Sequence, residues 1–263
     1  MGAIAASTGS RAEVAESVFW ASYARNIPTT GDTRDTGAVP VAGGYALCVQ
    51  GTWLDYALAA GRMRPLRADD LQTLDGFYTS RGLVPQAELH PTVAERDADL
   101  LTAWGYAPVR TVAVLERDIA AGLPEPALTV ESMDGRRSEW TELLVAAFAD
   151  ATAPSEADRL RRSLAASIAA GAQLFAARVD GRLVGGASLG MYGDVGFLMG
   201  AATLANFRNR GVHEALIAAR LRAAEARGAT YAFLKTDPDS TSMRSAERAG
   251  FTRAYDRVRM RKG

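Results

Sequence analysis

The sequence predicts a mixed α/β fold built from two similar halves, and three observations support this. Stretches with helical spacing of apolar residues alternate with short strand-like runs along the 263 residues. The segment "DIAAGLPEPA" (118–127) holds two prolines and a glycine, which is typical of a linker. One block of elements also recurs on both sides of this segment. We therefore expect domains at 1–120 and 128–263, joined by a linker at 121–127.

The recurring block is visible in two pairs of segments. "SRGLVPQAELHP" (80–91) resembles "ARGATYAFLKTDP" (226–238), and "LLTAWGYAPVRTVAVLER" (100–117) resembles "RSAERAGFTRAYDRVRM" (244–260). Both halves read helix, Arg-Gly, strand, proline turn, short helix, Gly-aromatic and strand. This order predicts a repeated supersecondary unit, although any mixed α/β chain can produce some matches of this kind.

Each element follows from local signals. The segment 67–82, for example, has acidic residues in its first turn and ends at a glycine, as helices often do. Residues 26–43 are rich in Thr, Gly, Asp and Pro and are expected to form a loop. Helices are expected at 11–25, 67–82, 92–105, 135–149, 155–171, 212–227 and 242–250. Strands are expected at 45–50, 53–60, 83–89, 106–117, 128–132, 172–180, 182–191, 195–204, 229–236 and 251–260.

Composition excludes several function classes. Lys plus Arg and Asp plus Glu each number 30, so the net charge is zero and no overall basic field favours nucleic acid. Cys48 is the single cysteine and there are two histidines, so a zinc site is not expected. No run of about 18 apolar residues predicts a membrane span. We expect a cytoplasmic protein without a metal site, nucleic-acid partner or membrane partner.

The stretch "ANFRNRGVHEALIAAR" (205–220) carries the clearest functional signal. A strand leads into two arginines and a glycine, and a helix follows. The start of a helix has unpaired N–H groups and a partial positive charge, and glycine lets a ligand approach the backbone closely. This combination predicts an anion cradle suited to phosphate. A plain connection with exposed arginines is the alternative, and the P-loop and dinucleotide fingerprints are both missing.

The helix after this loop is expected to bury one apolar face. Its expected members follow helical spacing and are Val212, Ala215, Leu216, Ala219, Ala223 and Ala226.

With these residues in hand, the second half resembles the GNAT N-acetyltransferase superfamily over about 128–260. That family carries [QR]-x-x-G-x-[GA] between its fourth strand and third helix, where the loop wraps the pyrophosphate of acetyl-CoA. The run from Arg208 to Val212 fits, whereas His213 departs from the last position. The ending "ERAGFTRAYDRVRM" also resembles the family's last helix and strand.

The resemblance implies two GNAT-like domains packed together, each with a central twisted mixed β-sheet flanked by helices. The first half looks like a degenerate copy, because its matching loop has Arg62 and Arg64 but Pro65 where the second half has Gly211. Proline has no N–H to offer an anion. We therefore expect a single cofactor site, in the second half, with a structural or substrate-shaping role for the first.

The family's chemistry implies acetyl transfer from acetyl-CoA to an amine of a small molecule or peptide. In the family, a backbone N–H of the fourth strand binds the thioester oxygen, which points here to Ala201, Ala202 or Thr203. No metal is implied. The expected cofactor-binding residues are Ala201, Ala202, Thr203, Arg208, Asn209, Arg210, Gly211, Val212, His213 and Glu214.

The proton donor for the leaving thiolate is left open by the sequence. The family often uses a tyrosine four residues before the Gly-Phe junction, and this chain has Ala246 there. Ser242, one turn earlier, and Tyr255, on the final strand, are the candidate catalytic residues, and water is the third possibility. A position facing the cofactor sulfur is expected for Ala246.

Two other functions compete with catalysis. The missing tyrosine favours a pseudoenzyme that binds CoA as a sensor without turnover. The short basic tail "RAYDRVRMRKG" favours an interaction module, although the zero net charge argues against nucleic acid. We expect a monomer or homodimer, and the acceptor amine is not predicted because substrate pockets are built from variable loops.

Overall fold

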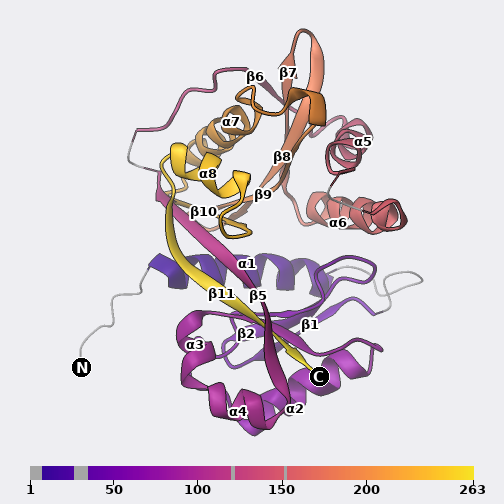
Figure 1. Cartoon of the computed structure of the whole chain (residues 1–263), viewed down its shortest axis with the longest axis vertical. Coiled ribbons are helices and arrows are strands. Elements are labelled where there is room, and N and C mark those ends of the chain that lie inside the picture. The colour runs from indigo at the N-terminus through magenta and orange to yellow at the C-terminus, as the bar shows by residue number, and fades with distance from the viewer. Residues whose placement is uncertain (1–7, 27–34, 120–121, 151–152) are drawn as a thin grey trace. The chain divides into compact units, whose positions relative to one another are not determined.

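The computed structural model describes residues 8–26, 35–119, 122–150 and 153–263 (Figure 1). They form two compact units, one made of 1–114 with 254–263 and the other of Leu115–Arg253. Most of the last strand thus groups with the first half, whereas the sequence placed all of 128–263 in the second domain. The predicted domain boundaries stay a prediction.

The first unit is a mixed sheet with helices. Its sheet has the strand order β1-β2-β3-β4-β11-β5, and β3 and β4 pair in parallel through Ala57↔Ala87 and Leu58↔Glu88. Its helices are α1 (Thr8–Asn26), α2 (Ala68–Thr79), α3 (Pro91–Arg96) and α4 (Ala98–Ala103). Its strands are β1 (Gly37–Val41), β2 (Gly44–Cys48), β3 (Ala57–Leu58), β4 (Gln86–Leu89), β5 (Tyr106–Asp118) and β11 (Thr252–Lys262), the last two extending into the second unit's residues.

The second unit has the strand order β10-β9-β8-β7-β6. Strands β6 to β9 are antiparallel, and β9 and β10 are parallel. Its strands are β6 (Thr129–Ser132), β7 (Gln173–Val179), β8 (Arg182–Tyr192), β9 (Val195–Thr203) and β10 (Tyr231–Thr236). Its helices are α5 (Arg137–Ala147), η2 (Pro154–Glu156), α6 (Ala157–Ala169), η3 (Ala205–Phe207), α7 (Val212–Ala226) and α8 (Thr241–Arg248).

Helices cover both faces of the second unit's sheet. Figure 1 shows α7 and α8 on one side of its strands and α5 and α6 on the other. Two adjacent glycines of β8 confirm this: a Cβ on Gly185 would meet Val212 of α7, and one on Gly186 would meet Trp140 and Leu144 of α5. The core under α5 and α6 is centred on Trp140, whose indole N–H donates to the Phe175 carbonyl oxygen at 3.0 Å.

Beyond Leu198, β9 parts from its parallel neighbour. The recorded pairs with β10 run from Val195↔Tyr231 to Leu198↔Leu234, whereas β9 continues to Thr203 and β10 to Thr236. On its other side β9 stays paired with β8 as far as Thr203. The end of β9 is therefore held from one side only, directly before the loop that leads into α7.

The expectation of a loop at 26–43 was wrong at both ends, where Asn26 belongs to α1 and a strand follows residue 36, and residues 27–34 lie outside the described part of the chain. Gly37–Val41 forms strand β1, which pairs antiparallel with β2 through a two-residue turn at Ala42 and Gly43. Both turn residues have positive φ (47° and 91°), the backbone that tight hairpins require. Pro40 is tolerated because β1 is the edge strand of the sheet order.

Two further expectations need correction. The expected helix at 92–105 is divided into α3 and α4 at Asp97, whose φ of −103° and ψ of 16° leave the helical region. The expected strand at 53–60 contracts to Ala57–Leu58.

The apolar face expected for α7 was also partly wrong. Ala226 is exposed, and Ala219 and Ala223 are half-buried. The buried face runs instead through Val212, Ala215, Leu216, Ile217, Ala218, Arg220, Leu221 and Ala224.

Candidate functional site

The loop between β9 and α7 is shaped by two left-handed residues. Asn209 has a φ of 60° and Gly211 a φ of 75°, a backbone region that asparagine and glycine enter most readily. Gly211 is the N-cap residue of α7 and has no side chain with which to cap the first N–H groups of the helix. A Cβ added at Gly211 would meet no atom within 4 Å. The N-cap position of α7 is therefore open to a ligand, whereas the N–H of Glu214 is already bonded by its own carboxylate.

The two arginines of this loop have different partners. Arg208 forms an ion pair with Asp150 at 2.9 Å and donates from Nε to the Thr203 carbonyl oxygen at 3.3 Å. The guanidinium carbon of Arg210 lies 5.3 Å from the ring centroid of Phe207. Arg208, Asn209 and Arg210 are all exposed. The loop before α7 thus carries two exposed positive charges, and that of Arg208 is already paired with a carboxylate.

The first turn of α7 is tied to α8 by side chains. Glu214 pairs with Arg248 and accepts a hydrogen bond from the Ser245 hydroxyl at 3.1 Å. His213 Nε2 lies 3.4 Å from the hydroxyl oxygen of Ser242. Burial lowers the pKa of His213 to about 4, and Arg220 adds to the effect. The imidazole is therefore neutral at pH 7 and adds no positive charge to the loop.

This loop and the strands and helices around it match a known family. The model of the acetyltransferase (GNAT) family matches residues 137–251. Within the second unit, residues 137–251 thus match a GNAT acetyltransferase domain. This confirms the resemblance drawn from the sequence and supports acyl transfer as the general activity.

Solved structures extend the likeness to the GNAT fold over most of the chain. A GCN5-related N-acetyltransferase from Kribbella flavida is 20% identical, with a TM-score of 0.64 over 88% of this chain and 91% of that one. A GCN5-related N-acetyltransferase from Sphaerobacter thermophilus is 20% identical, with a TM-score of 0.55 over 79% of this chain and 71% of that one.

A third similar structure is a tandem GNAT protein from the clavulanic acid biosynthesis pathway. It is 17% identical, with a TM-score of 0.58 over 85% of this chain and 81% of that one. At these identities the likeness concerns the fold, and the predicted mixed α/β fold with GNAT-like halves is confirmed. No curated protein matches the sequence.

The predicted oxyanion donors lie at the end of β9 in the GNAT domain. Ala202 is buried, and Ala201 and Thr203 are half-buried. All three follow Leu198, the last β9 residue paired with β10. Their assignment as thioester-binding residues remains a prediction, as does that of the loop residues.

The two candidate catalytic residues are not brought together within one unit. Ser242 begins α8 of the GNAT domain, beside His213. Tyr255 belongs to the first unit, where its hydroxyl donates to Glu13 at 2.8 Å and its ring centroid lies 4.4 Å from that of His90.

Ala246 does not have the expected exposure toward a cofactor. It is 0% exposed on the inner face of α8, so the expectation that it points toward the cofactor sulfur and not into packed core was wrong. A tyrosine side chain at this position would have to displace packed atoms.

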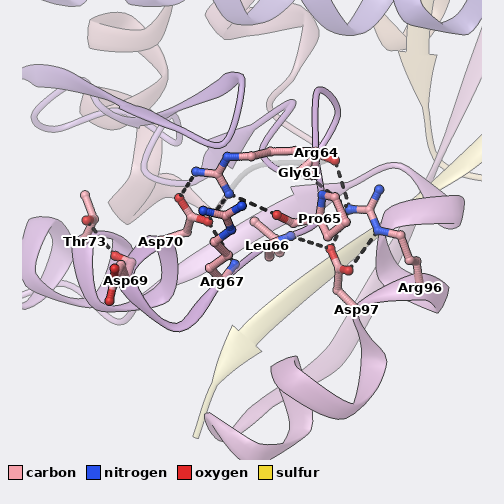
Figure 2. A network of polar contacts seen from close by, with 10 residues as sticks. All are labelled: Gly61, Arg64, Pro65, Leu66, Arg67, Asp69, Asp70, Thr73, Arg96 and Asp97. Atoms are coloured by element: carbon pink, nitrogen blue, oxygen red, sulfur yellow. Dashed lines mark hydrogen bonds and ion pairs between the residues drawn. The ribbon is translucent and has the colours of Figure 1, made fainter.

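The matching loop of the first unit is closed by its own carboxylates (Figure 2). Asp97 accepts the backbone N–H of Leu66 at 3.0 Å, and Asp70 accepts that of Arg67 at 2.9 Å. These N–H groups stand at the start of α2, where a bound anion would otherwise be held. Internal carboxylates thus occupy the donors that remain beside Pro65.

Each of these carboxylates is neutralised by an arginine. Arg64 makes two hydrogen bonds to Asp70, at 2.6 and 2.8 Å, and these lower the pKa of the Asp70 carboxyl. Burial raises the pKa of Asp97, but the hydrogen bonds from Arg96 and from the Leu66 N–H outweigh it and the net pKa is lowered. Both carboxylates therefore stay charged at neutral pH and keep their hydrogen bonds to the N–H groups of Leu66 and Arg67.

The structure also contains residues near the site that the sequence interpretation missed. Asp150 pairs with Arg208, and the buried Arg220 of α7 donates to carbonyl groups of β8 and β9. For Arg220, the sequence did offer a signal, namely an arginine within the apolar run "EALIAARL". Among the described residues no cluster of His, Cys, Asp or Glu is arranged for a metal ion, and none of the described helices is long and apolar enough to cross a bilayer.

Proposed function

We propose that this chain is an N-acetyltransferase that moves an acetyl group from acetyl-CoA to an amine of a small molecule or peptide. The observation that supports it most is the open start of α7, with Gly211 left-handed at the N-cap and the arginines Arg208 and Arg210 beside it. Backbone N–H groups and fixed positive charge at a helix start are suited to a pyrophosphate. Arginine forks bind phosphate oxygens through two hydrogen bonds.

In the proposed reaction the amine lone pair attacks the thioester carbonyl carbon. A C–N bond forms, the C–S bond breaks, the nitrogen releases a proton and the thiolate takes one up. A lysine-like amine has a pKa of about 10.4, so freeing its lone pair at pH 7 costs about 4–5 kcal/mol. The carbonyl oxygen becomes negative in the transition state, and a backbone N–H of Ala201, Ala202 or Thr203 would stabilise it. Thiolate protonation would come from Ser242, Tyr255 or water.

We propose one CoA site per chain. Three features close the first unit's loop: Asp70 and Asp97 occupy the N–H groups of Arg67 and Leu66, and Pro65 offers none. An incoming pyrophosphate would have to displace two carboxylates that are each paired with an arginine. The N-cap residue of α7 offers no such competitor, and the carboxylate of Glu214 bonds the N–H of Glu214 itself.

The experiment combines calorimetry with a thiol-release assay. We expect one acetyl-CoA bound per chain, and release of free thiol with at least one amine in a broad panel. Two equal sites per chain would contradict the assignment of a single loop.

Tight CoA binding without thiol release from any amine would favour the second candidate, a CoA-binding sensor. The absence of the family's tyrosine at Ala246 is the observation that favours it. We further propose that the protein is cytoplasmic, acts as a monomer or homodimer and has no nucleic-acid or membrane partner. Gel filtration with light scattering tests the oligomeric state, a salt series of DNA- and RNA-binding assays tests nucleic-acid binding, and cell fractionation tests the location and membrane association.

A further inference from the structure

Arg220 is a buried charge without an acidic partner. Its side chain lies on the inner face of α7, and the residue is 2% exposed. No carboxylate among the described residues pairs with it, and burial lowers its pKa to about 9. A guanidinium nevertheless keeps its proton at neutral pH. Burying an unpaired ion costs several kcal/mol even after the protein relaxes, so its hydrogen bonds must supply a large compensation.

The compensation comes from three carbonyl groups. Nη1 of Arg220 donates to the carbonyl oxygens of Met199, at 3.2 Å, and of Ser188, at 3.4 Å. Nε donates to the Leu216 carbonyl oxygen of its own helix at 2.9 Å. The buried hydroxyl of Ser188 donates to the same Met199 oxygen at 3.3 Å. The Met199 carbonyl thus accepts two side-chain hydrogen bonds inside a β-sheet.

A β-bulge explains why these carbonyls need side-chain donors. The register of β8 and β9 shifts between the pairs Gly186↔Ala202 and Ser188↔Met199. Between these pairs β9 has two residues, Gly200 and Ala201, and β8 has one. Gly200 has a φ of 49°, which glycine adopts at little cost. A bulge disrupts the ladder locally, and polar groups that it frees must find other partners.

The bulge stands at the point that matters for the proposed reaction. It follows Leu198, where pairing of β9 with β10 ends. Of the predicted oxyanion donors, Ala201 lies in the bulge, and Ala202 and Thr203 follow it directly. Its shape therefore sets the direction in which these N–H groups point. Donors aimed at the developing charge before the reaction cost no reorganisation when it occurs.

We infer that Arg220, with Ser188, is a positioning residue that holds the β9 bulge in the shape required to bind the thioester carbonyl. This inference rests on the proposed acetyltransferase function. The guanidinium acts through the backbone: a hydrogen bond from a cation to the Met199 oxygen polarises the Met199–Gly200 peptide group. This peptide group leads directly into the bulge, so fixing it fixes the path of the backbone toward Ala201, Ala202 and Thr203. The positive charge also favours a negative oxygen at the end of β9.

The test compares Arg220→Met with Arg222→Met, a matched control on the same helix. Arg222 contacts the Pro124 carbonyl oxygen and Glu125, not β8 or β9. Loss of one oxyanion donor typically lowers kcat about 10²–10³-fold. We expect Arg220→Met to lower kcat about 10- to 100-fold, because it misaligns donors without removing them. The dissociation constant of CoA should stay within about twofold, because the loop at the start of α7 is unchanged.

Amide hydrogen exchange gives a second readout that needs no turnover. Exchange at residues 200–203 should accelerate about tenfold or more in Arg220→Met and stay unchanged in Arg222→Met. Ser188→Ala removes the weaker donor and should lower kcat about two- to fivefold. Arg220→Lys keeps the charge but has fewer donors. Its kcat and its exchange rate at residues 200–203 should therefore lie between those of the wild type and of Arg220→Met.

The outcomes separate this inference from the proposed function. Normal kcat and normal exchange at 200–203 in Arg220→Met would overturn the positioning role. If Arg220→Met fails to fold, Arg220→Lys and Ser188→Ala serve as the test. Unchanged amide exchange at residues 200–203 in both variants would then overturn the positioning role. If the wild-type protein releases no thiol with any amine, the acetyltransferase proposal fails, whereas the exchange experiment still tests the hold on the bulge.

Discussion

His213 Nε2 lies 3.4 Å from the hydroxyl oxygen of Ser242, so the first turn of α7 and the first turn of α8 meet through one polar pair. Because burial keeps His213 neutral at pH 7, its ring nitrogen can accept or donate a hydrogen bond, depending on the tautomer. The hydroxyl of Ser242, one turn before the position where the family often has its tyrosine, therefore already has a protein partner.

Ser242→Ala should lower kcat less than tenfold. A lost general acid typically costs about 10²–10⁴-fold, but the hydroxyl is engaged with His213, and a thiolate can take its proton from water. The measurement is thiol release at saturating acetyl-CoA, with Thr241→Ala, an exposed neighbour on the same helix, as the control. A fall of a hundredfold or more would instead identify Ser242 as the acid.

Gly211→Ala should weaken CoA binding about fivefold or more. Its φ of 75° disfavours a side chain, and escape from this strain moves the N–H groups at the start of α7. Gly228→Ala is a matched control, because Gly228 follows the other end of α7 with a φ of 81° and equally open space. Both variants should lose about 1 kcal/mol of stability, but only Gly211→Ala should alter affinity. Equal CoA affinity in both variants would remove the loop from the site.

Arg208→Ala and Arg210→Ala should each raise the Michaelis constant for acetyl-CoA and leave kcat nearly unchanged. Phosphate contacts remote from the reacting carbon hold the ground state and the transition state alike. Asp150→Asn should strengthen binding about two- to threefold at low salt, because it frees Arg208 from its ion pair. Loss of kcat with an unchanged Michaelis constant would contradict this role for the arginines.

Ala246→Tyr should destabilise the protein. The residue is 0% exposed, and overpacking a core position typically costs about 1–3 kcal/mol. Glu247→Tyr, at an exposed position on the same helix, is the control and should be nearly neutral. Thermal unfolding is the measurement. Equal melting temperatures for Ala246→Tyr and Glu247→Tyr would show that α8 accommodates a large side chain at position 246, as the sequence alone suggested.

Acid should reduce stability through His213. Its pKa is about 4 in the folded protein against an ordinary 6.5, so between these values the unfolded chain binds a proton that the folded chain does not. The free energy of unfolding is therefore unaffected by this group above about pH 6.5 and falls as pH drops toward 4. The full effect is up to about 3 kcal/mol, since one pKa unit corresponds to about 1.4 kcal/mol.

Denaturant unfolding at several pH values measures this dependence. His213→Gln should reduce the loss of stability between pH 6.5 and 4 without abolishing it, because burial also lowers the pKa of His90 to about 4. An unchanged pH slope in His213→Gln would show that His213 is protonated without cost.

The sequence by itself determined the features that depend on neighbours along the chain. The order of strands and helices in the GNAT domain follows from local periodicity. The loop from Arg208 to Gly211 could be predicted as an anion site because glycine and arginine must stand next to the helix start to act there, and this assignment stays a prediction. Pro65 likewise identified the first unit's loop as unsuited to an anion, because the missing N–H is a property of the residue itself.

Tertiary structure decided everything that depends on partners distant in sequence. Strand β1 was hidden because Pro40 is tolerated only at a sheet edge, and sheet order is not a local property. Asp97 closes a loop 31 positions away at Leu66. Arg220 turns inward although it is charged, because a bulge 21 positions away leaves carbonyl oxygens that need a donor. The role of a buried polar group depends on the atoms with which it forms hydrogen bonds, and only the folded chain brings those atoms together.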